Sequence, residues 1–340
     1  MKRILLIMVV TLAVAGMAFA GGQKEAEEKE AVSQEEEKEK AITVGVSYAS
    51  LDLQFFQFYQ KGIQEAAEAA GIKLVEMDSF YDAEKQVSNI ESLITQDVDA
   101  MIVQPVDEAA VVAGVMAANR ANIPVFALDR PPAGGEISGY LSAGHEVIGP
   151  MQAKFIAGEL DGEGNVVLVQ GPLGESYTRK LTEGVEKLFR DEYPDITILD
   201  KQSAGGWDRA KAMAVMEDFI QKHGEDIDAV IATSDLLAMG AVQALKAADI
   251  LDEVAVVGAD ADLDMLQGIK KGEISGTVNP LPYLSGKIAL DAAVLLAQGK
   301  KLPEAEMIKG IPTLDLGPEI YVITQENVDK TDEWGVVPVE

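Results

Sequence analysis

Short apolar runs and longer amphipathic stretches alternate along most of the chain. The runs are rich in Val and Ile and are typical of buried strands, whereas the stretches between them carry apolar residues at helical spacing. In the first half, the expected strands are residues 42–47, 72–77, 100–104 and 124–128. The expected helices between them are residues 55–70, 83–96 and 108–122. This alternation predicts a parallel sheet with right-handed crossovers and helices on both faces.

The alternation of expected strands and helices is interrupted near residues 137–145 and then resumes. The second series of expected strands is residues 165–169, 196–200, 229–232, 254–258 and 275–278. Its expected helices are residues 175–191, 207–223, 235–249 and 262–271. A further helix is expected at 284–298, and extended chain at 312–323. The pattern therefore predicts an α/β protein with two lobes, each built on a doubly wound parallel sheet.

The N-terminus has the pattern of a secretory signal peptide. Lys2 and Arg3 precede an apolar run at residues 4–15, which Ala18-Phe19-Ala20 follows as a cleavage site. An uncleaved membrane anchor is the alternative, but the apolar stretch is shorter than the roughly 20 residues that span a bilayer. We expect a signal peptide at residues 1–20 and an acidic, disordered tether at residues 21–41. The mature protein is then expected to start near Gly21 and to be soluble outside the cytoplasmic membrane.

Composition and charge exclude several classes of function. The 340 residues include 28 basic and 57 acidic side chains, and a net charge of −29 argues against nucleic acid as a partner. The absence of cysteine excludes disulfides, thiolate metal sites, cysteine nucleophiles and a lipid anchor on cysteine. His145 and His223 are far apart in the sequence, which argues against a multi-histidine metal site. We therefore expect neither a metal nor a cofactor.

Candidate ligand contacts follow the expected strands, because open α/β sheets bind ligands beyond the carboxyl ends of their strands. Phe55 and Phe56 open the first helix, where one ring can face a sugar and the other the core; two core rings are the alternative. Asp129 and Arg130 follow the strand at 124–128. A carboxylate and a guanidinium together suit a ligand with many hydroxyls, although a local ion pair is an equally good interpretation.

The second lobe offers further candidates. Arg179 lies on the first turn of a helix after the loop at 171–174, which is either a weak anion site or an ordinary turn. Trp207 can stack on a ligand or pack a helix on the sheet, and Asp208-Arg209 beside it are expected to cap and solvate the end of the helix. His145 is expected in a hinge region rather than as a catalytic base.

Asp260 ends a strand and is a candidate acceptor of ligand hydroxyl bonds, while Asp262 is expected to cap the next helix. Residues 260–271 do not make a calcium loop, because Met265 occupies the glycine position and Lys271 the position of the bidentate Glu. The sequence also shows no nucleophile paired with a base, so we do not expect an enzyme.

In their order, these residues resemble the ribose-binding group of periplasmic sugar-binding proteins, from about Ile42 to Val322. The matching strings are Phe55-Phe56, Asn122-Ile123-Pro124-Val125 continuing to Leu128-Asp129-Arg130, Trp207-Asp208-Arg209, Ser234-Asp235 with Ala238-Met239-Gly240-Ala241, and Val256-Val257-Gly258 leading to Asp260.

The resemblance implies a clamshell whose lobes are joined by a hinge of three crossing strands. The first lobe would be residues 42–144 plus 281–312, and the second residues 145–280 plus 313–340. A monosaccharide or related small polyol would lie between Phe56 and Trp207, with Phe55 beside them. Its hydroxyls would bond Asp129, Arg130, Arg179 and Asp260. By the same resemblance, the protein is a monomer that presents its ligand to the permease of an ABC importer and sometimes to a chemoreceptor.

Three amide positions of the ribose pattern differ in this chain. An asparagine near the first strand aligns with Leu53, next to Asp52; another aligns with Ser234; and a glutamine aligns with Pro280, next to Asn279. Asp52, Ser234 and Asn279 are therefore added to the candidate contacts. Because a site built for particular hydroxyls discriminates strongly, the ligand is expected to be another pentose, a hexose, a sugar alcohol or a furanosyl signal.

Other classes of function remain as alternatives. A sensor of a sugar or furanosyl signal in chemotaxis or regulation would use the same cleft. A regulator of the lactose-repressor type would need an N-terminal helix-turn-helix, where this chain has a signal peptide and an acidic tether. A secreted enzyme could act on a sugar through Asp129 and Asp260, since paired carboxylates can do such work.

Overall fold

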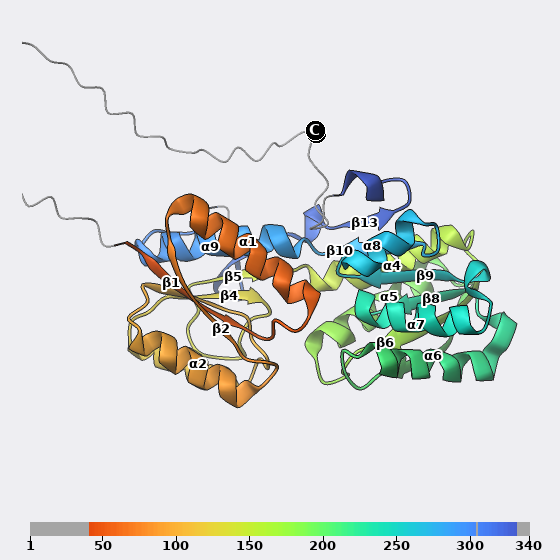
Figure 1. Cartoon of the computed structure of the whole chain (residues 1–340), viewed down its shortest axis with the longest axis horizontal. Helices are drawn as coiled ribbons and strands as arrows, with labels where there is room; N and C mark the ends of the chain where they lie inside the picture. Colours follow the sequence, from red (N-terminus) through yellow and green to blue (C-terminus); the bar gives the residue numbers. More distant parts are fainter. Residues whose placement is uncertain (1–40, 304, 332–340) are drawn as a thin grey trace, which may run out of the picture. The chain divides into compact units, whose positions relative to one another are not determined.

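The computed structural model describes residues 41–303 and 305–331 (Figure 1). The signal peptide expected at 1–20, and the tether up to residue 40, lie outside the described residues. Among the helices of this described part, none is long and apolar enough to cross a membrane.

The first lobe is built on a sheet whose order in the described chain is β11-β12-β5-β4-β3-β1-β2. Its strands pair in parallel except for β11 with β12, which are antiparallel. The strands are β1 (Thr43–Tyr48), β2 (Lys73–Asp78), β3 (Ala100–Val103), β4 (Val125–Asp129), β5 (Gly139–Ser142), β11 (Glu306–Ile308) and β12 (Ile311–Asp315). The helices of this lobe are α1 (Gln54–Ala70), α2 (Ala83–Thr95), α3 (Val112–Arg120) and α9 (Pro282–Ala297).

The second lobe is built on a sheet of order β13-β10-β9-β8-β6-β7, in which only the edge pair β10–β13 is antiparallel within the described chain. Its strands are β6 (Gly164–Gln170), β7 (Ile196–Ser203), β8 (Ala229–Ala232), β9 (Ala255–Ala259), β10 (Gly276–Asn279) and β13 (Tyr321–Thr324). Its helices are α4 (His145–Glu159), α5 (Ser176–Glu192), α6 (Arg209–His223), α7 (Asp235–Ala247) and α8 (Leu263–Lys270). Short 3-10 helices are η1 (Gly224–Asp226), η2 (Leu251–Glu253), η3 (Gly317–Glu319) and η4 (Val328–Lys330).

Each sheet has an apolar core on both of its faces. Along β6, Val167 and Val169 pack into one core of the second lobe, whereas Val166 and Leu168 pack into the other. Side chains alternate between the two faces of a strand, so a continuous apolar run is what a strand covered on both faces requires. The predicted fold class, two doubly wound α/β lobes, is confirmed.

Two elements near the interruption at residues 137–145 were not predicted, namely β5 and α4. β5 is only four residues long, and its side chains alternate between buried and half-buried positions. α4 contains Pro150 and buries Gly149 and Ala153, so it lacks the stripe of large apolar residues that marks an amphipathic helix. The chain expected to be extended at 312–323 forms two strands, β12 and β13, which η3 separates.

Within the described residues, the chain passes between the two sheets three times: from β5 to α4, from β10 to α9 and from β12 to β13. The predicted boundary at residue 312 falls inside β12. Residues 313–315 pair in parallel with β5 of the first lobe, so the last crossing follows Asp315.

Candidate ligand-binding site

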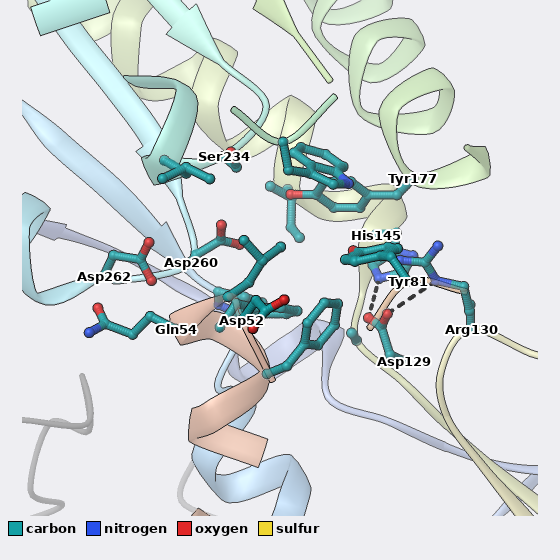
Figure 2. A pocket seen from close by; sticks show the side chains of 18 of the residues that line it. Asp52, Gln54, Tyr81, Asp129, Arg130, His145, Tyr177, Ser234, Asp260 and Asp262 are labelled. Atoms are coloured by element: carbon teal, nitrogen blue, oxygen red, sulfur yellow. Dashed lines mark hydrogen bonds and ion pairs between the residues drawn. The ribbon is translucent and has the colours of Figure 1, made fainter. Parts of the chain in front are cut away.

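A cavity of about 260 Å³ lies where the carboxyl ends of strands from both lobes meet (Figure 2). This volume is close to the lower limit of about 300 Å³ for small-molecule sites, and a single water molecule needs only roughly 10–15 Å³. The structure therefore offers room for a small ligand. The sequence-predicted candidates that line the cavity are Asp52, Phe55, Phe56, Asp129, Arg130, Trp207, Ser234 and Asp260. Lining residues without a predicted ligand role include Gln54, Tyr81, His145, Tyr177, Arg209, Asp262 and Asp264.

The structure places two predicted candidates outside this cavity. The exposed guanidinium of Arg179 donates to the carbonyl oxygens of Leu173 (3.3 Å) and Gly174 (2.7 Å). Asn279 is fully buried at the crossing from β10 to α9. Its Oδ1 accepts a bond from the backbone N–H of Leu281 at 2.8 Å, and its Nδ2 donates to the hydroxyl of Tyr321 at 3.1 Å. Asn279 therefore fixes the backbone of the hinge.

One end of the cavity is a network of alternating charges around Asp129, which ends β4 with a positive φ of 72°. Its Oδ1 lies 2.9 Å from Nε2 of His145, and its Oδ2 accepts from Nε of Arg130 at 3.3 Å. Nη1 of Arg130 also donates to Oε2 of Glu175 in the second lobe at 3.2 Å. Burial favours a raised pKa for Asp129, but His145 and Arg130 outweigh it and hold that pKa below its usual value. The Asp129–Arg130 pair thus both lines the cavity and forms an ion pair.

Aromatic rings line the cavity on both lobes. In the first lobe Phe55 and Phe56 lie with their ring centroids 5.3 Å apart, and Tyr81 lies 5.9 Å from Phe56. Phe56 is only 2% exposed and belongs to the core, while Phe55 is half-buried. In the second lobe Tyr177 and Trp207 lie 5.9 Å apart. Flat apolar faces from both sides suit the C–H faces of a small ring.

Trp207 is held in place by two contacts. Its Nε1 donates to Oε1 of Glu175 at 3.1 Å, and its ring lies over the backbone of Gly171. A Cβ atom at residue 171 would come within 2.5 Å of the indole, so only glycine leaves the ring in this position. Glu175 therefore links Trp207 to Arg130 and connects the two lobes.

The other end of the cavity is rich in carboxyl groups. Asp260 and Asp262 line it, and Asp235 lies behind them, where its oxygens accept from the hydroxyl of Thr277 (2.7 Å) and the backbone N–H of Asp262 (2.9 Å). Burial, together with the charges of neighbouring carboxylates, raises the pKa of both Asp235 and Asp260 well above the usual value. Burial raises the pKa of Asp262 to about 7, with Asp264 adding to the rise and Arg209 opposing it.

The prediction that Asp262 caps α8 was wrong for its side chain. Asp262 occupies the N-cap position, but its carboxylate makes no capping bond within the described chain. Its Oδ1 is buried and has no hydrogen-bond partner among the described residues. Its carboxylate instead lines the cavity. Figure 2 shows the carboxylates of Asp260 and Asp262 near Gln54 and Asp52, across the cavity from Asp129. Asp260 and Ala261, which precede Asp262, have positive φ values of 126° and 62°.

Hydrogen bonds also join side chains of one lobe to the other lobe. Oε1 of Gln54 accepts from the backbone N–H of Leu263 at 2.8 Å, and the hydroxyl of Ser176 donates to Oε1 of Glu108 at 2.6 Å. Together with the Arg130–Glu175 ion pair, these bonds hold the lobes closed over the cavity. A ligand inside would be enclosed by contacts from both lobes.

Two α/β lobes closed over a small polar and aromatic cavity define a protein that captures a small solute. The family model for the periplasmic binding protein domain matches residues 44–301, and the chain belongs to this family. Among curated proteins, the ribose import binding protein of Bacillus subtilis is 35% identical over 263 residues, which cover 77% of this chain and 84% of that protein. The xylitol-binding protein of Mycolicibacterium smegmatis is 33% identical over 273 residues, covering 79% and 74%.

Solved structures agree with this assignment. An ABC transporter solute-binding protein of Bacillus halodurans with bound myo-inositol has a TM-score of 0.75 and 29% identity, covering 85% of this chain and 96% of that one. A periplasmic solute-binding protein of Actinobacillus succinogenes with bound D-allose has a TM-score of 0.77 and 26% identity, covering 85% and 99%. The prediction of a binding protein of the ribose-binding type, rather than an enzyme, is confirmed.

Proposed function

We propose that the cavity binds one monosaccharide or related small polyol, which the protein delivers to the permease of an ABC importer. The observation that carries this proposal is a small cavity with aromatic walls on both lobes and hydrogen-bonding charges at both ends. Ring faces pack against the C–H faces of a sugar, while carboxylates accept bonds from its hydroxyls and a guanidinium donates to its oxygens. The ribose, xylitol, myo-inositol and D-allose in the names of the relatives support this class of ligand.

Binding and closure are coupled in this proposal. A ligand that touches Phe55 and Asp129 in the first lobe and Trp207 and Asp260 in the second makes its full set of contacts only when the lobes are closed. It therefore stabilises the closed form by its difference in affinity for the two forms. The permease would recognise the closed lobes, and an open lobe pair would release the ligand.

The cellular setting belongs to the same proposal. The basic residues, apolar run and A-x-A site at the N-terminus support export through a cleaved signal peptide, and the absence of cysteine argues against a lipid anchor. We propose that the mature protein works in the periplasm as a monomer, with a chemoreceptor as a further partner of the closed form.

The test is a thermal-shift screen of the purified protein against pentoses, hexoses, sugar alcohols and cyclitols. A ligand at a thousand times its Kd adds about 4 kcal/mol to the free energy of unfolding, which gives a clear rise in Tm. Arg130→Gln should abolish the shift, because it removes a donor from the cavity and leaves Asp129 with one partner fewer.

Arg179→Gln is the matched control, since it removes the same kind of group from outside the cavity and should leave the shift intact. If Arg179→Gln abolishes the shift and Arg130→Gln does not, the assignment of the cavity is wrong. If no member of the panel raises Tm, the proposed class of ligand is wrong.

A further inference from the structure

Charges are unevenly divided between the two ends of the cavity. Five carboxylates line it but only two guanidinium groups do, those of Arg130 and Arg209. At the first end, Arg130 and His145 are both bonded to Asp129. The side chains of Asp129, Arg130 and His145 therefore already have partners without a ligand, and this end offers a polyol a set of ordinary hydrogen-bonding groups.

The second end has more carboxylates than cations. Asp260 and Asp262 line it, with Asp235 behind them, and burial together with the charges of neighbouring carboxylates raises the pKa of Asp235 and that of Asp260. The cation that faces them is Arg209, but its Nη2 is 2.9 Å from Oδ2 of Asp264, so its charge is shared with another carboxylate. Among the described residues, Asp260 and Asp262 therefore have no unshared cation that would stabilise their ionised forms.

Asp262 shows directly that this end lacks a donor. Its Oδ1 is buried within the described structure without a hydrogen-bond partner there. Gln54, which Figure 2 shows nearby, accepts from the backbone N–H of Leu263 through its side-chain oxygen, and its amide nitrogen, the atom that could donate, makes no hydrogen bond to Oδ1 of Asp262 within the described structure. A buried carboxylate oxygen without a donor costs free energy, and a ligand that supplies a donor there recovers it.

We propose that the ligand carries a protonated primary amine among its hydroxyls, as an amino sugar or aminocyclitol does, and that the ammonium lies against Asp260 and Asp262. The proposal rests on the proposed function, since it names a subclass of polyol for the same cavity. An ammonium has three donors and no acceptor, so it matches a cluster of acceptors better than a hydroxyl, which has one donor. It also brings the positive charge that this end lacks.

Other occupants fit this end less well. An anionic sugar would add a negative charge beside carboxyls whose ionised forms already destabilise one another. A metal ion would need at least three converging ligands, and among the described residues no group of three or more His, Asp or Glu side chains is arranged to hold one. A neutral sugar would bring no positive charge to stabilise the ionised carboxyls.

The experiment compares matched pairs of probes by isothermal titration calorimetry at pH 7. The pairs are D-glucosamine with D-glucose, D-galactosamine with D-galactose, an inosamine with its inositol, and a 1-amino-1-deoxyalditol with its alditol. We expect at least one amine to bind ten times more tightly than its neutral partner. In Asp262→Asn, which keeps the shape of the side chain but removes its charge, this ratio should fall at least fivefold.

Asp252→Asn is the control, because it removes the same charge from an exposed side chain of η2, outside the cavity, and should leave the ratio unchanged. Asp260→Asn provides a second test at the same end, in case Asp262→Asn fails to fold. If neutral members bind at least as tightly in every pair, the amine is excluded and the polyol function stands. If Asp262→Asn and Asp260→Asn both keep the ratio, the placement of the ammonium is wrong. If no member of any pair binds, the amine proposal is contradicted, and the thermal-shift panel separately decides the proposed function.

Discussion

Asp262 gives the first prediction at the scale of single residues. Its pKa of about 7 in the folded protein lies above the ordinary value of 3.8, so between these pH values the folded protein binds more protons than the unfolded chain. The free energy of unfolding therefore falls as pH rises from about 4 to about 7. Without ligand, Asp262→Asn should melt higher than wild type at pH 8, by on the order of 5 °C, and the gain should shrink toward pH 4.

Melting curves at pH 4, 6 and 8 check this prediction. Asp235, Asp260, Asp264 and Arg209 face Asp262, so the variant also relieves the first two of these carboxyls of a neighbouring charge. Asp252→Asn, at an exposed site, should show no such dependence on pH. An equal shift of Asp262→Asn at pH 4 and pH 8 would show that the carboxyl is not the titrating group.

The sequence predicted the cavity residues that directly follow a strand. It failed for residues whose place in the cavity depends on the direction in which the side chain points. Asp129, Arg130 and Asp260 stand at strand ends, where the topology alone places them. Tyr177 and Arg179 share the first turn of α5, but residues two apart point about 200° away from each other, so one faces the cavity and the other the solvent. No periodicity in a loop-to-helix junction reveals which of the two faces inward.

At the scale of elements, the loop between β6 and α5 positions Trp207. Gly171→Ala would place a Cβ atom 2.5 Å from the indole ring and push the ring toward the cavity. Overpacking of this kind costs about 1–3 kcal/mol, so we expect ligand affinity to fall by about tenfold or more, with a shift in the fluorescence of Trp207. Titration of the ligand against intrinsic fluorescence measures both effects.

Gly174→Ala is the matched control in the same loop. A Cβ atom at residue 174 meets no atom within 4 Å among the described residues, so the variant should bind like wild type. Equal affinities for Gly171→Ala and wild type would mean that the ring of Trp207 can move without consequence, and that it does not contact the ligand.

The helix α4, which the sequence did not predict, contains a second pair of contrasting glycines. Gly149 lies against α5, where an added Cβ would come within 2.1 Å of the carbonyl oxygen of Leu181, whereas Gly158 is exposed with open space in the described structure. Gly149→Ala should lower the free energy of unfolding by about 1–3 kcal/mol, because the helices must separate. Gly158→Ala should raise it by roughly 0.5–1 kcal/mol, since alanine favours a helix. Denaturant titrations with unchanged slopes measure both, and a loss of stability in both variants would contradict this packing.

The close approach at Gly149 also explains why α4 escaped prediction. A helix that packs through glycine and alanine shows little contrast between its faces, and Pro150 inside it is normally a sign of a helix end. The ring of Pro150 instead lies against Gly184 of α5, where an added Cβ would come within 2.6 Å of Cδ. Sequence periodicity detects helices that bury large side chains, and α4 contacts its neighbour through small ones.

At the scale of the whole molecule, the two lobes and their order were predictable because buried strands need continuous apolar runs. What the sequence could not predict was how the lobes contact each other. Gln54, Glu108, Glu175 and Ser176 form bonds between the two lobes, yet each is a polar residue in or beside a loop, with no pattern that distinguishes it from a solvated side chain. Such contacts depend on the angle between lobes, which no local signal encodes.

Glu175 gives the prediction for the closure of the molecule. It accepts from Arg130 in the first lobe and from Trp207 in its own lobe, so it contributes to the closed form and to the cavity wall. Glu175→Gln removes the charge that attracts Arg130 and should destabilise the closed form by about 1.4 kcal/mol, which corresponds to a tenfold faster release of ligand. Stopped-flow fluorescence of Trp207 measures the rate.

Glu183→Gln, at an exposed position on α5, is the control and should release ligand at the wild-type rate. Small-angle scattering of the ligand-free protein adds an independent readout, because a molecule held closed by Glu175 should become larger in Glu175→Gln and stay unchanged in Glu183→Gln. Equal release rates and equal dimensions for both variants would mean that closure depends on the ligand and the other bridging bonds alone.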